Sequence, residues 1–221
     1  VAYLHATGGT RLNDFRQQNE ESPYWGVINQ MRTSYTPADL QVGFKASPLP
    51  GLGFHLFGGY RVTKDEIFHL PGITDTDFPY CYSLLMQEKA KVGYGGIKAA
   101  YGYKDIFDFS VGGTYYGWNV KDEAKVLLYL KPEFVLDASA RAKVYDEFWI
   151  SAAYRYEGRV KAGELEKADA INNLSLSAGY EFFNSLNVFV RFNNLLNQDY
   201  ITEAGYPVQG FNAMAGVSFR F

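Results

Sequence analysis

The residues best suited to chemistry in this sequence are charged side chains that alternate with apolar ones. The candidate site residues are Arg141, Arg155, Glu157, Arg159 and Arg191. Because successive side chains of a β-strand point to opposite faces, these charges would share the polar face of a sheet. They could line a water-filled path for a solute. Because more of them are positive than negative, such a path would favour anions. Alternatively, they could pair with one another or with a plug inside the sheet.

Residue patterns for catalysis are missing from the sequence. The three histidines (His5, His55 and His69) share no close spacing, and no H-x-x-x-H spacing, carboxylate pair or nucleophile elbow occurs. We therefore expect no enzyme, no cofactor and no metal site. The net charge of −3 gives no basic field for nucleic acid. The lone Cys81 cannot form an internal disulfide.

Long alternating strands would position the charges, and the clearest ends at Phe221. Its apolar face would hold Phe211, Ala213, Ala215, Val217, Phe219 and Phe221. The same period of two recurs near residues 40–46, 52–63, 107–116, 134–144, 148–157, 173–182 and 186–193. The apolar faces carry almost no charge, which suits contact with lipid. No run of 18 apolar residues exists, and the mean hydropathy of −0.21 fits a barrel as well as a soluble protein.

The connections between these strands alternate in length. Short turns fall near 48–51, 104–106, 145–147 and 183–185, and longer polar loops near 9–24, 64–88, 120–131, 161–170 and 196–210. Outer-membrane barrels have this layout, with short periplasmic turns and long external loops. A soluble β-sandwich also alternates, but these strands exceed the usual ~5–6 residues. The predicted fold class is therefore all-β: one antiparallel transmembrane β-barrel segment over residues 1–221, with about ten strands.

Two strands need special treatment in this scheme. Residues 1–8 would form the first strand, and the second would run from near Trp25 to Ser47 through Pro37. A break at Thr36-Pro37 into two shorter strands is the alternative, because proline cannot donate to a ladder. In the fourth strand, a β-bulge at Gly95-Gly96 would reset the alternation. Ala90, Val92, Tyr94, Ile97, Ala99, Tyr101 and Tyr103 would then face the same way.

The carboxyl-terminal segment 188–221 carries a more specific pattern. It contains N-L-L-N at residues 194–197 with Tyr200, then G-Y-P at residues 205–207 with Gly210, and a closing aromatic. This set resembles the carboxyl-terminal signature of TonB-dependent outer-membrane receptors. The stretch from Lys131-Pro132 to Gly158 is similar to the penultimate hairpins of that family.

The resemblance implies a carboxyl-terminal part of a Gram-negative outer-membrane receptor barrel of about 22 strands. Such a receptor would import a scarce nutrient, namely an iron chelate, cobalamin or a glycan. Its partners would be outer-membrane lipid, the barrel-assembly machinery, and TonB acting through a plug domain absent from this chain. The family also implies an assembly signal at Phe219 and Phe221. The alternative is a complete small barrel of about ten strands that acts as a passive pore or adhesin.

Overall fold

The computed structural model describes residues 1–21, 31–71, 83–183, 185–203 and 206–220, and within them ten strands form one antiparallel sheet. The strands follow chain order, β1-β2-β3-β4-β5-β6-β7-β8-β9-β12. Their bounds are β1 (Ala2–Arg11), β2 (Ser34–Leu49), β3 (Leu52–Pro71), β4 (Ser83–Tyr103), β5 (Phe107–Asn119), β6 (Pro132–Lys143), β7 (Phe148–Arg159), β8 (Ile171–Phe182), β9 (Leu186–Asn193) and β12 (Asn212–Phe219). The other elements are the hairpin β10 (Ile201–Glu203) with β11 (Tyr206–Pro207), the helix α1 (Phe15–Glu21) and the 3₁₀ helix η1 (Asp122–Leu128). The predicted all-β fold is confirmed.

One face of the sheet is apolar and exposed, as the alternation predicts. Leu56, Ile97, Tyr115 and Val217 each leave more than half of their surface uncovered, at 58%, 54%, 55% and 67%. Phe134 and Tyr156 lie together on this face, with ring centroids 6.2 Å apart. A soluble domain rarely exposes so broad an apolar patch. We call this side the apolar face and the opposite side the polar face.

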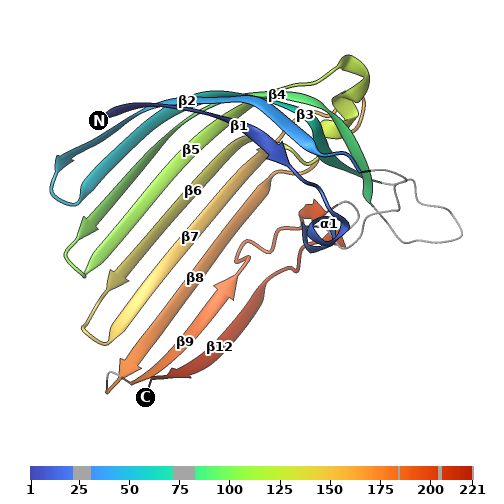
Figure 1. Cartoon of the computed structure of the whole chain (residues 1–221). Helices are drawn as coiled ribbons and strands as arrows, with labels where there is room; N and C mark the ends of the chain where they lie inside the picture. Colours follow the sequence, from blue (N-terminus) through green and yellow to red (C-terminus); the bar gives the residue numbers. More distant parts are fainter. Residues whose placement is uncertain (22–30, 72–82, 184, 204–205, 221) are drawn as a thin grey trace, which may run out of the picture.

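The four short connections all lie at one end of the sheet (Figure 1). They join β2 to β3, β4 to β5, β6 to β7, and β8 to β9. We call this the short-turn end, and the opposite one the long-loop end. The predicted alternation of short and long connections is therefore confirmed. Neither described helix is long and apolar enough to cross a membrane.

The sheet is an open, curved wall (Figure 1). Among the described residues, β1 and β12 are its two edges and do not pair with each other. The structure therefore does not show the closed ten-stranded barrel of the alternative hypothesis.

β3 and β4 extend well into the region predicted as the loop 64–88. Their pairing continues to Pro71 and Ser83, past a register shift between Thr63 and Glu66. Asp65 lies at this β-bulge with a φ of 55°. The bulge breaks the alternation of the sequence, which is why Lys64-Asp65-Glu66 read as a loop. Similarly, β1 continues through Arg11 and α1 occupies part of the predicted loop 9–24.

The β-bulge predicted at Gly95-Gly96 is wrong. The register between β3 and β4 is unbroken from Leu52 to Thr63, so Tyr94 lies on the polar face, opposite to Ile97. Its ring covers Gly59, where a Cβ atom would come within 2.4 Å of the Tyr94 ring. The glycines of this region therefore make room for aromatic rings and leave the alternation unchanged.

β2 passes through Pro37 as one strand, as predicted, but with a bulge. The register of β2 against both β1 and β3 shifts at this position. A bulge is where a strand tolerates proline, because no ladder hydrogen bond is needed there. The start predicted near Trp25 lies outside the described residues, and β2 begins at Ser34.

A small hydrophobic core at the long-loop end fixes η1 against β3 and β4. Its buried members are Phe68, Ala90, Ala124, Leu127, Leu128 and Ala162. The Lys131 ammonium lies 5.1 Å from the Phe68 ring centroid and 5.5 Å from that of Trp118. On the solvent side of η1, the hydrogen bond from Lys125 to Asp122 (2.7 Å) lowers the pKa of that carboxyl. Part of the predicted loop 120–131 is thus ordered structure.

Candidate functional site: the polar wall

Three of the five predicted site residues form one chain of charges on the polar face. Arg155 contacts Asp137 on β6 at 2.9 Å and Glu157 at 2.7 Å. Glu157 in turn accepts a hydrogen bond from Arg159 at 2.6 Å. The side chains of Glu157 and Arg159 are only 10% and 4% exposed. Their charges are paired, as buried charges must be.

Arg159 joins the wall to two connections at the long-loop end. Its Nη1 atom donates to the carbonyl of Leu130, and its Nη2 atom donates to the carbonyl of Ile201 (3.0 Å). Its Nε atom is buried and has no hydrogen-bond partner among the described residues. Next to it, Asn173 on β8 donates to the hydroxyl of the buried Tyr200 (3.0 Å). This part of the charge pattern therefore anchors the two connections at the long-loop end.

The other two predicted residues lie apart from this anchor. Arg141 is exposed, and its guanidinium carbon lies 4.6 Å from the Trp149 ring centroid. Arg191 is also exposed and stands opposite Ser177 and Met214. The structure thus brings Arg155, Glu157 and Arg159 together and leaves Arg141 and Arg191 separate.

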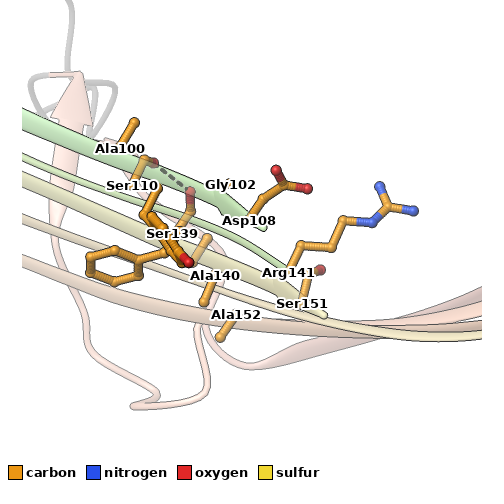
Figure 2. A pocket seen from close by; sticks show the side chains of 12 residues that line it. Ala100, Gly102, Asp108, Ser110, Ser139, Ala140, Arg141, Ser151 and Ala152 are labelled. Atoms are coloured by element: carbon orange, nitrogen blue, oxygen red, sulfur yellow. Dashed lines mark hydrogen bonds between the residues drawn. The ribbon is translucent and has the colours of Figure 1, made fainter. Parts of the chain in front are cut away.

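Small side chains open a shallow hollow beside Arg141. Figure 2 shows Ser110, Ser139 and Ser151 with Asp108 and Arg141 at one side of the hollow, which has a volume of about 450 Å³. The hydroxyls of Ser110 and Ser139 are hydrogen-bonded at 2.8 Å. The hollow forms because small residues of β5, β6 and β7 line it, namely Ser110, Ser139, Ala140, Ser151, Ala152 and Ala153.

The N-L-L-N motif folds the last long connection through its two asparagines. Asn194 is buried, donates to the carbonyls of Gln198 and Gln209, and accepts from the Gln198 amide. Asn197 accepts from the Phe211 amide at 2.9 Å. Both have positive φ values, 48° and 46°. Asparagine suits these positions because it tolerates the left-handed region and bonds the local backbone.

Replacing Asn194 should loosen this connection. Asn194→Ala leaves two carbonyls unpaired, at a cost of roughly 1–3 kcal/mol, and strains a left-handed residue by a further ~1–2 kcal/mol. Limited proteolysis should then cut residues 195–210 faster than in the parent protein. The control is Asn197→Asp, which keeps both the acceptor oxygen and the tolerance for positive φ. Equal cleavage rates in the two variants would contradict this role of Asn194.

A polar pocket at the long-loop end of β1, β2 and β3 was missed by the sequence analysis. It has a volume of about 320 Å³, and we call it the mouth pocket. Its hydroxyl groups come from Thr7, Thr10, Ser34, Thr36 and Thr63, and its charges from Arg11, Asp39, Arg61 and Glu66. Its residues lie on three strands and meet only because β1 and β2 both shift register near Pro37.

A row of aromatic rings crosses the polar face below the mouth pocket. It contains Tyr3, His55, Phe57, Tyr94 and Tyr116, with successive ring centroids 5.8, 5.0, 6.5 and 6.4 Å apart. The Tyr3 hydroxyl is hydrogen-bonded to His55 Nε2 at 2.8 Å. We call this row the aromatic row. The signal that could have revealed it is an aromatic residue at a polar-face position opposite a glycine, such as Tyr3 opposite Gly43.

The predicted assembly-signal residues lie at the end of the chain. Phe219 is the last residue of β12, pairs with Leu186 and is 64% exposed on the apolar face. Phe221 lies outside the described residues. Among the described residues, no cluster of three or more His, Cys, Asp or Glu side chains could hold a metal ion.

Solved structures share this wall. The copper transporter OprC matches with 15% identity and a TM-score of 0.70, over 100% of this chain and 38% of its own. The ferric-catecholate import receptor Fiu from E. coli K12 matches with 15% identity and a TM-score of 0.68, over 100% of this chain and 33% of its own. The pyoverdine outer membrane receptor FpvA from Pseudomonas aeruginosa PAO1 matches with 17% identity and a TM-score of 0.67, over 100% of this chain and 34% of its own. No family model matches the chain, and no curated protein matches it.

These matches establish the class of fold, which is the barrel wall of TonB-dependent outer-membrane receptors. The resemblance predicted from the segment 188–221 is confirmed at this level. The chain spans about a third of the length of the receptors it matches.

Proposed function

We propose that the chain is the carboxyl-terminal barrel portion of a TonB-dependent receptor in a Gram-negative outer membrane. The receptor takes up a scarce nutrient: an iron chelate, cobalamin or a glycan. One observation carries the proposal: the open wall matches receptor structures over its whole length while spanning about a third of theirs. In this setting the apolar face contacts lipid, the short-turn end lies in the periplasm, and the long-loop end is external.

The partners follow from this proposal. Every described element belongs to the wall or its connections, so a plug that contacts TonB would come from outside these residues. The charges of Arg141, Arg155, Glu157, Arg159 and Arg191 would face the interior of the barrel. Phe219 and Phe221 would present the assembly machinery with the closing aromatic side chains.

Uptake by the intact receptor in its host tests the proposal. Radiolabelled ferric tris-catecholate, ferric citrate, cyanocobalamin and maltohexaose serve as probes. We expect uptake of at least one probe to fall to background when the receptor gene is deleted, and equally when TonB is deleted. Uptake that depends on the receptor but not on TonB, with a steady open conductance in a planar bilayer, would support a passive pore instead.

A further inference from the structure

The mouth pocket combines donors and acceptors in a way that favours a particular ligand. Its guanidinium groups, on Arg11 and Arg61, only donate hydrogen bonds, whereas the carboxylates of Asp39 and Glu66 only accept them. Threonine and serine hydroxyls between them do both. Two positive and two negative charges balance, so the pocket has no excess charge that would select an anion. A neutral ligand with many hydroxyl groups matches this set.

Several of these groups are available to a ligand. Within the described residues, no ion pair joins Arg61 to a carboxylate, although its side chain is half-buried. Arg11 donates a hydrogen bond from Nε to Asn13, and its terminal nitrogens have no partner among the residues that the structure describes. Ser34 and Thr63 are buried and fixed by bonds to Asp65 and Thr36. The pocket therefore has a fixed floor, and within the described part of the chain none of its four charged side chains forms an ion pair.

The aromatic row reaches the mouth pocket through Tyr94. The Tyr94 ring covers Gly59, which lies two residues before the pocket residue Arg61 on the same face of β3. Tyr3 lies over Gly43 and Tyr94 over Gly59, so one face of each ring rests on the backbone. Among the described residues, the Lys45 ammonium lies 5.5 Å from the Tyr3 ring centroid, whereas no cation lies over the Tyr94 ring. Flat aromatic faces pack well against the C–H faces of sugar rings, whose hydroxyl groups lie around the edge.

We propose that the mouth pocket and the aromatic row form a binding site for a neutral oligosaccharide. Sugar hydroxyls would bond Arg61 and Asp39, and a neighbouring sugar ring would stack on Tyr94. The pocket volume of about 320 Å³ is at the lower end of the range for small-molecule sites. A single sugar unit would therefore occupy it, with the rest of the chain along the row. This inference rests on the proposed function and names its substrate class.

Binding of neutral oligosaccharides to the intact receptor tests the site. The purified receptor in detergent is applied to an array of neutral plant, fungal and bacterial oligosaccharides, and isothermal titration measures Kd for the best probe. We expect Arg61→Gln and Asp39→Asn each to weaken this binding at least tenfold. Arg220→Gln, an exposed arginine just after β12 that belongs to neither the pocket nor the row, is the matched control and should leave Kd unchanged. Far-UV circular dichroism verifies that every variant retains its β-structure.

The other outcomes separate this inference from the proposed function. If the receptor binds no neutral oligosaccharide on the array, the inference is wrong. It is also wrong if Arg61→Gln and Asp39→Asn leave Kd unchanged. TonB-dependent uptake of ferric tris-catecholate or cyanocobalamin, without oligosaccharide binding, would overturn the substrate class and leave the proposed receptor intact. Uptake that is independent of TonB would remove the proposed function itself.

Discussion

Arginine at Leu176 should destabilise the folded protein by about 2–4 kcal/mol, because the new charge would face the middle of the bilayer. Leu176 lies near the centre of β8, on the apolar face, and is 42% exposed. Val190 on β9 stands directly opposite Ala178 of β8 and is 36% exposed, so Val190→Arg should have a similar cost. Urea titration of the intact receptor refolded in phospholipid vesicles measures the free energy of unfolding.

Ser177 provides the control because it is next to Leu176 in sequence but points to the polar face. Ser177→Arg would place the guanidinium in the watery interior, opposite Arg191. Repulsion between two exposed charges costs less than ~1 kcal/mol. If Leu176→Arg and Ser177→Arg had equal costs, the assignment of the two faces would be wrong.

Replacing Arg159 should have the second large effect. Arg159→Met removes the cation that pairs with the buried Glu157 and the donors that reach Leu130 and Ile201. Removing one partner of a buried ion pair typically costs about 3–5 kcal/mol. Arg155 still contacts Glu157 from the other side, which places the expected value at the lower end. The same urea titration gives the loss of stability.

Local measurements identify the anchoring role. Hydrogen exchange of the amides in residues 129–131 and 198–203 should accelerate in Arg159→Met, because these segments lose their contact with β7. Arg141→Met is the matched control: its arginine is exposed and stacks on Trp149, so the cost should be ~0.5–1 kcal/mol. Unchanged exchange in both segments would show that Arg159 does not hold them.

The face of most strands follows from sequence because lipid leaves only apolar residues stable on one side. Leu56, Ile97 and Val217 could be placed without any tertiary information. Tyr94 could not, since an aromatic side chain suits either face. Its position depends on the opposite residue, Gly59, which alternation on a single strand does not reveal. Similarly, the polar run 64–66 predicts a loop from sequence. In the structure it is a β-bulge, and β3 and β4 remain paired beyond it.

For the candidate site too, some features follow from alternation along one strand and others depend on contacts between distant segments. Arg155, Glu157 and Arg159 alternate on one strand, so their shared face was predictable from sequence. Their attachment to Leu130 and Ile201 depends on how distant connections fold back. Predicting the mouth pocket would require the pairing of three strands, because its residues come from β1, β2 and β3, whose register shifts near Pro37. A single sequence indicates which residues share a face, but pairing between strands decides which ones meet.

The unequal lengths of the strands determine how far parts of the wall extend from the membrane. β3 and β4 have 20 and 21 residues, roughly 65–70 Å at ~3.3 Å per residue. A tilted strand needs only ~9–11 residues to cross the hydrocarbon. In the proposed orientation, about half of this ribbon therefore stands outside the membrane, stiffened by η1. In that orientation this ribbon is the first part of the wall that an antibody or a phage would contact.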